Sequence, residues 1–97
     1  MTALEEVTRQ LAPQIDQLVE HLTLTEEMRG AAFFSSVGEA VRAVKEEADL
    51  LEVFFALSTT AFQGFVFDPL AARMVDEILA YAEQVSHAFM ASEDVRH

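Results

Sequence analysis

Few side chains in this sequence could perform acid–base or metal chemistry. The chain has no cysteine, and its three histidines are His21, His87 and His97. On a helix, Glu83 and His87 would lie one turn apart on the same side, so they could offer two ligands to a metal ion. A di-iron bundle needs paired Glu-x-x-His motifs with further inward carboxylates, and the sequence contains none. We therefore expect no metal site and no cofactor.

Nucleophilic catalysis has no clearer basis. Serines such as Ser35, Ser58 and Ser86 lack the sequence contexts of catalytic nucleophiles, and the three glycines form no phosphate-binding loop. His21 lies near the end of a helical pattern, where a histidine is usually solvated and favourable to the helix dipole. We expect that the protein is not an enzyme.

The composition favours a compact protein with an acidic surface. Of 97 residues, 52% are hydrophobic, and the formal net charge is −11. The apolar content argues against disorder, and the charge argues against direct binding to nucleic acid or anionic lipid. The first residues lack a secretion signal, and no apolar run approaches the roughly 20 residues of a membrane span. We therefore expect a cytoplasmic protein.

The sequence predicts an all-α fold with a single domain over residues 1–97. Helical periodicity runs through nearly the whole chain, and no period-two strand pattern is present. The predicted helices span about 2–22, 25–34, 36–62 and 69–91. Together they would form a small bundle of three or four antiparallel helices.

The first predicted helix has one apolar side. Steps of three and four residues connect its apolar positions: Leu4, Val7, Leu11, Ile15, Leu18 and Leu22. Pro13 lies inside this pattern, where it cannot donate a backbone hydrogen bond. We expect Pro13 to kink the helix or to split it after Leu11.

The middle of the chain can be divided in two ways. Ser36 with Glu39 forms a capping box and Gly38 is a weak helix former, so we separate helix 25–34 from helix 36–62. One bent helix over 25–62 is the alternative. Across this region a heptad-like seam predicts buried residues, above all its phenylalanines: Phe34, Val37, Val41, Val44, Ala48, Leu51, Phe55, Ser58 and Phe62.

The last predicted helix has the clearest start. Asp68 is placed to cap it, and Pro69 suits its first turn. Steps of three to seven residues predict its buried positions: Leu70, Met74, Ile78, Val85 and Phe89.

Phenylalanine is concentrated in the middle of the chain, at positions 33, 34, 54, 55, 62, 65 and 67. Side chains of consecutive residues such as Phe54 and Phe55 point about 100° apart on a helix, so one helix face cannot bury all seven phenylalanines. Seven aromatic side chains represent about 1,000 Å² or more of apolar surface, which a short chain has difficulty covering alone. We therefore expect a homodimer.

These features together predict a protein–protein interaction module. We expect a bacterial homodimeric regulator or adaptor that binds a further, unidentified protein, for example by sequestering a transcription regulator as small antiactivators do. The residues expected to bind the partner are Phe54, Phe55, Leu57, Phe62, Phe65 and Phe67. Two alternatives remain: an acidic, immunity-type inhibitor that covers a basic site, and a bundle that carries an apolar small molecule.

Overall fold

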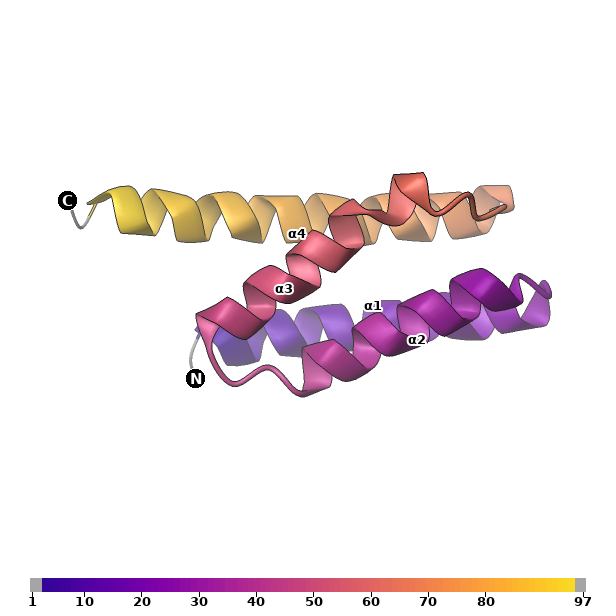
Figure 1. Ribbon diagram of the computed structural model, residues 1–97, viewed down its shortest axis with the longest axis horizontal. Coiled ribbons are helices and arrows are strands. Elements are labelled where there is room, and N and C mark those ends of the chain that lie inside the picture. The colour runs from indigo at the N-terminus through magenta and orange to yellow at the C-terminus, as the bar shows by residue number, and fades with distance from the viewer. Residues whose placement is uncertain (1–2, 96–97) are drawn as a thin grey trace.

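The chain folds into helices alone over the part that the structure describes, which confirms the predicted all-α class. This structure, a computed structural model, describes the backbone of residues 3–95 and their side chains except at positions 61 and 89–95. Its elements are α1 (Ala3–Leu24), α2 (Met28–Arg42), α3 (Glu47–Ser58), the 3₁₀ turn η1 (Thr60–Phe62) and α4 (Pro69–Val95). Figure 1 shows α1 and α2 as an antiparallel hairpin, with α3 running obliquely from that hairpin towards α4.

Helix α1 forms as its apolar pattern predicts, with Val7, Leu11, Ile15, Leu18 and Leu22 buried. The expected split after Leu11 is wrong, because α1 continues through Pro13 to Leu24. Pro13 is exposed, whereas the positions two residues before and after it are fully buried. Packing on both sides of the proline therefore holds the helix together although one backbone donor is missing.

Helix α2 contradicts the predicted boundary between residues 34 and 36. It runs without a break from Met28 to Arg42 and includes Gly38, which is buried. A Cβ atom at position 38 would lie 3.2 Å from Cγ2 of Ile15, so glycine lets α1 and α2 approach closely here. Gly38 is thus a packing residue of the hairpin, and the apparent capping box at Ser36 does not start a helix.

The predicted long helix over 36–62 is also wrong, as is the single bent helix over 25–62, because the chain leaves the helix after Arg42. Helix α3 begins only at Glu47. The Asp49 carboxylate accepts hydrogen bonds from the backbone nitrogens of Lys45, at 3.0 Å, and Glu46, at 3.3 Å. These bonds satisfy donors at the start of the new helix, so the chain can turn and direct α3 across the hairpin.

Three consecutive hydroxyl groups mark the end of α3. Ser58, Thr59 and Thr60 each donate a side-chain hydrogen bond to the carbonyl oxygen three residues earlier, at 2.6–2.7 Å. These bonds add to the backbone contacts of the last turn, where the Thr59 nitrogen donates to the Ala56 carbonyl oxygen at 3.1 Å. The helix therefore stops at Ser58, and η1 follows as a tighter turn.

Helix α4 begins where the sequence predicts, since Asp68 accepts a hydrogen bond from the Ala71 nitrogen at 2.7 Å. Its buried side is rotated from the predicted one and is formed by Ala71, Val75, Ile78 and Ala82. Leu70, predicted to be buried, is exposed, while Met74 and Val85 are half-buried. The predicted burial of Phe89 concerns a side chain outside those described.

The core lies between the hairpin, α3 and α4. Phe34 is its largest fully buried side chain and is surrounded by the buried stripes of the four helices. Within residues 3–95, no helix has both the length and the apolarity that a membrane span requires.

Replacement of Phe34 by alanine should lower the free energy of unfolding by about 3–5 kcal/mol, because it removes a buried ring and leaves a cavity. Urea denaturation followed by circular dichroism would measure the loss. Ser35→Ala, at an exposed neighbouring position, should change stability by less than about 0.5 kcal/mol. Equal effects of the two substitutions would contradict the placement of the core.

Candidate interaction surface

Three large apolar side chains lie exposed along α3 and η1, and we call them the ridge: Leu51, Phe55 and Phe62. Phe55 is 73% exposed and Phe62 is 88% exposed. Because a phenylalanine side chain covers roughly 150–250 Å², these two leave on the order of 300 Å² of apolar surface in water. Exposed apolar area of this order is comparable to the largest patch on many soluble monomers, and such patches are often functional.

The exposure of the ridge shows that the second half of the predicted heptad-like seam is wrong. Phe34, Val37 and Val41 are buried as the seam predicts, but Phe55 and Phe62 are not in the core. The break at 43–46 separates the two halves of the seam, and α3 turns a different stripe inward: Leu50, Val53, Phe54 and Leu57. Helix α3 is therefore apolar on two sides, and the described side chains of the other elements cover only the inner one.

A groove lies beside the ridge, in the angle between α3 and the second half of α4. It has a volume of about 380 Å³. Phe54 and Leu57 contribute from α3, and Leu79 and Ala82 contribute from α4. Polar side chains complete its lining: Ser58, Glu83, Ser86 and His87. The groove thus combines apolar walls with few charged groups.

Four aromatic rings pack together beneath the loop between η1 and α4. The Phe33 ring meets Phe34 edge-on at a centroid distance of 5.0 Å and lies 5.3 Å from Phe65. Phe67 lies 6.3 Å from Phe34 and 6.0 Å from Phe65. Such distances are favourable for aromatic pairs, so Phe65 and Phe67 anchor the loop to α2. The Arg29 guanidinium carbon, 5.8 Å from the Phe65 ring centre, covers the outer side of this cluster.

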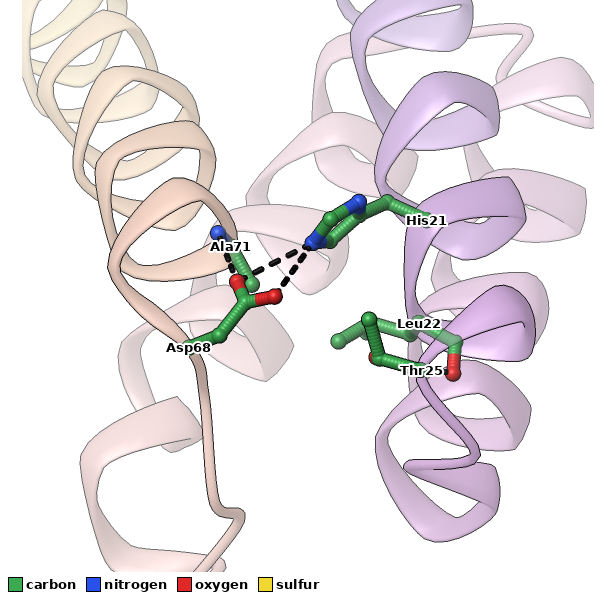
Figure 2. A network of polar contacts seen from close by, with 5 residues as sticks. All are labelled: His21, Leu22, Thr25, Asp68 and Ala71. Atoms are coloured by element: carbon green, nitrogen blue, oxygen red, sulfur yellow. Dashed lines mark hydrogen bonds and ion pairs between the residues drawn. The ribbon is translucent and has the colours of Figure 1, made fainter.

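Polar contacts hold the same loop against the α1–α2 turn. Figure 2 shows the His21 ring reaching from α1 to the Asp68 carboxylate, with Nε2 2.9 Å from Oδ2 and 3.0 Å from Oδ1. Asp68 also caps α4, so one carboxylate connects two helices. Nearby, the Glu27 carboxylate accepts from the backbone nitrogens of Val66, at 2.9 Å, and Gly30, at 3.3 Å.

Both carboxylates are stabilised in their charged form. The pKa of Asp68 is lowered, first by the hydrogen bond from the Ala71 backbone and then by the one from His21. The pKa of Glu27 is lowered mainly by the Val66 and Gly30 backbone donors. The two acids therefore act as structural acceptors that fix the loop, and neither has the raised pKa of a catalytic acid.

A second exposed apolar group lies at this end of the molecule, and we call it the tip: Leu24, Met28, Val66 and Leu70. Leu24 is 75% exposed and Val66 is 78% exposed. The hydrogen bond from Val66 to Glu27 and the contact of His21 with Asp68 place the two segments beside each other. Figure 1 shows the α1–α2 turn and the start of α4 at the same end of the molecule.

The pair considered for metal chemistry lies on the groove rim. His87 Nε2 is 3.9 Å from Glu83 Oε1, and both side chains are 76% exposed. Among the residues that the structure describes, no three His, Asp or Glu side chains are grouped so that they could hold a metal ion. The arrangement supplies at most two ligands in open solvent, which does not form a metal site.

The six residues predicted to bind a partner fall into three environments. Phe55 and Phe62 are exposed on the ridge, Phe54 and Leu57 are buried and line the groove, and the other two are half-buried in the aromatic cluster: Phe65 and Phe67. The sequence analysis missed the tip. Leu24 and Val66 belong to segments between predicted helices, and isolated aliphatic residues there give no periodic signal.

No protein family, no curated protein and no solved structure matches this chain.

Two substitutions of Asp68 distinguish its role as the cap of α4 from the role of its negative charge. Asp68→Ala removes the cap and the His21 contact and should lower the unfolding temperature by several degrees, whereas Asp68→Asn keeps a capping oxygen and should lower it less. The pKa of Asp68 is lowered in the folded state, so the ionised carboxylate stabilises the fold at pH values above its ordinary pKa near 4. This contribution to the free energy of unfolding is lost as the pH falls through the folded-state pKa.

Thermal unfolding between pH 7 and pH 2 would test this assignment. The difference between the wild type and Asp68→Asn should shrink towards zero at the acid end, because a protonated carboxyl and an amide are both neutral. A difference that stays constant over the whole range would show that the charge of Asp68 has no role.

Proposed function

We propose that this chain is a small acidic protein–protein interaction module, a homodimeric regulator or adaptor. The observation that carries the proposal is the ridge, where Phe55 and Phe62 lie in water although the inner side of α3 is already packed. Large exposed aromatic side chains commonly act as anchors in protein–protein interfaces.

The ridge is the surface we assign to self-association. Its uncharged neighbours on α3 are Ala48 and Ser58, both exposed. Two exposed carboxylates border it, since Glu47 lies one turn before Leu51 and Glu52 one turn before Phe55. A standard interface covers about 800 Å² on each partner. The two ring surfaces supply on the order of 300 Å² of this, and the adjoining groove and rim extend the patch.

The tip is the surface we assign to a second protein. It lies at the α1–α2 turn and adjoins the η1 end of the ridge, because Arg29, next to Met28, donates a hydrogen bond at 3.2 Å to the carbonyl oxygen of Gln63, next to Phe62. A dimer centred on Phe55 is proposed to leave it accessible. With a net charge of −11, the module should favour a partner that carries apolar side chains surrounded by lysine or arginine, and its field should speed their encounter. A regulator that sequesters another regulatory protein would work in this way.

Sedimentation equilibrium would test the role of the ridge. The wild type should be dimeric at micromolar concentration, and the double variant Phe55→Ser with Phe62→Ser should be monomeric, because serine removes the apolar area that association would bury. The matched double variant Leu24→Ser with Val66→Ser, at the tip, should remain dimeric.

Circular dichroism of the ridge variant provides the folding control. Its helical signal should match that of the wild type, since neither substituted side chain is in the core. A wild-type chain that stays monomeric at 100 µM, or a ridge variant that still dimerises, would rule out self-association through this surface.

The tip generates a separate prediction. In affinity capture from cells of the source organism, a partner bound by the wild type should be lost with Leu24→Ser and Val66→Ser, and its purified complex should weaken as salt increases. Equal capture by the wild type and the tip variant would show that the tip is not the partner surface.

A further inference from the structure

We propose that residues 64–68, which we call the strap, form a pH-sensitive element that opens as one unit when the carboxylates of Glu27 and Asp68 become neutral. The strap is the extended segment between η1 and α4. When closed, it covers the aromatic cluster, and opening would separate its two rings from Phe34 in the core. Val66 of the tip lies on the strap, so opening would also move it away from the rest of that surface.

Side chains hold the strap in place. In the described part of the chain, residues 64–67 make no backbone–backbone hydrogen bond. The half-buried rings of Phe65 and Phe67 pack in the cluster, while Gly64 and Val66 are exposed. A segment with few backbone hydrogen bonds and little buried area opens at a lower free energy than the helices around it. The strap can therefore open while the bundle stays folded.

Two carboxylates hold the strap from opposite sides. Glu27, in the α1–α2 turn, accepts through Oε1 from the first turn of α2 and through Oε2 from the Val66 nitrogen of the strap, at 2.9 Å. Asp68, at the end of the strap, accepts through Oδ1 from the Ala71 nitrogen of α4, and its Oδ2 lies 2.9 Å from His21 Nε2 of α1. Figure 2 shows the Asp68 carboxylate between these two partners. Each carboxylate thus caps one helix and connects the strap to the hairpin.

Protonation weakens both attachments of each carboxylate together. A neutral carboxyl loses its favourable interaction with the helix N-terminus and its charge-assisted hydrogen bond to the opposite segment. The pKa of Glu27 is lowered in the closed form, mainly by the Val66 donor. The pKa of Asp68 is lowered first by the Ala71 donor and then by His21. Closure is therefore favoured above the ordinary pKa of these acids, about 4, and is lost as the pH falls through the closed-state pKa.

Other ionisable side chains at this site come from each neighbouring segment: His21 on α1, Glu26 in the α1–α2 turn, Arg29 on α2 and Asp76 on α4. A protonated histidine would strengthen the contact with an ionised Asp68, and an arginine keeps its charge at any pH. Among the described contacts, Glu26 and Asp76 make no side-chain hydrogen bond to the strap. The two carboxylates that hold the strap are therefore the groups whose titration releases it.

Gly64 provides the hinge. Its φ of 74° lies in the left-handed region that favours glycine, and a Cβ atom there would meet no atom within 4 Å. The preceding residue is held in place, because Arg29 donates to the Gln63 carbonyl oxygen at 3.2 Å. The strap can therefore rotate about Gly64 without a steric clash while η1 keeps its position.

Hydrogen–deuterium exchange tests whether the strap opens as one unit. The Val66 amide is bonded to Glu27, yet His21→Ala, which removes only a contact of Asp68, should speed its exchange at pH 7. The expected increase is about tenfold or more, because a hydrogen bond to a charged group contributes that much to closure. The matched control His87→Ala, at an exposed position on α4, should leave the exchange of Val66 unchanged, and amides within α1 should stay protected in both variants.

A tryptophan probe tests the response to pH. The chain has no tryptophan, so Phe67→Trp reports on the strap alone. Its emission should move to longer wavelength between about pH 5 and pH 3 while the helical circular dichroism is retained. With Glu27→Gln and Asp68→Asn added, the emission should already be at longer wavelength at pH 7. The matched pair Glu26→Gln and Asp76→Asn removes the same charge and should keep the response of the probe to pH.

These measurements require neither a dimer nor a partner, so their results are independent of the proposed function. Exchange of Val66 that does not respond to His21→Ala would show that the two carboxylates act on separate segments. Emission and helical signal that change at the same pH would show that acid unfolds the whole bundle, which would overturn the proposal. If Phe67→Trp does not fold, exchange of the wild type decides, because Val66 must then lose protection at a higher pH than the amides within α1.

Discussion

Helix α3 has apolar side chains on two sides, and the remaining helices can cover only one of them. Its inner stripe, which includes Leu50 and Leu57, completes the core against α1, α2 and α4. Its outer side carries Leu51 and Phe55, and Phe62 follows in η1; the described part of the chain leaves all three side chains exposed. Burial of apolar area is the main favourable term in both folding and association, so an apolar side of α3 that folding leaves exposed is the surface we propose for binding.

The sequence was most informative where one periodic pattern decided the structure. In α1, the steps between Val7 and Leu22 identify the buried side, and packing along that stripe is strong enough to keep the helix continuous across Pro13. The low helix propensity of Pro13 predicted a split that does not occur, because tertiary packing outweighs the loss of a single backbone hydrogen bond. The start of α4 was predictable for a related reason, since Asp68 and Pro69 act through contacts within the same turn.

The middle of the chain was harder to predict because its apolar pattern allows either of two sides of α3 to face the core. The seam from Phe34 to Phe62 is regular over its whole length, yet only its first half is buried. The contacts that decide this lie outside the pattern: Asp49 captures two backbone donors before α3, and Gly38 has its role only because Ile15 of another helix lies against it. Neither contact can be derived from spacing alone. The excess of phenylalanine did indicate apolar surface beyond the needs of the core, but it did not distinguish Phe54 from Phe55, whose environments are opposite.

The loop between η1 and α4 connects the two apolar surfaces. Phe65 and Phe67 attach it to α2 by aromatic packing, while Glu27 and Asp68 attach it to the α1–α2 turn by charge-assisted hydrogen bonds. The same loop presents Val66 to solvent at one end and follows directly after Phe62 of the ridge at the other. A carboxylate that accepts hydrogen bonds from two segments keeps both in a single arrangement, so the exposed side chains beside it are held in place before any partner arrives. Rigid presentation lowers the entropy that binding must overcome, which is the physical reason that we propose a binding role for exposed surfaces of modest area.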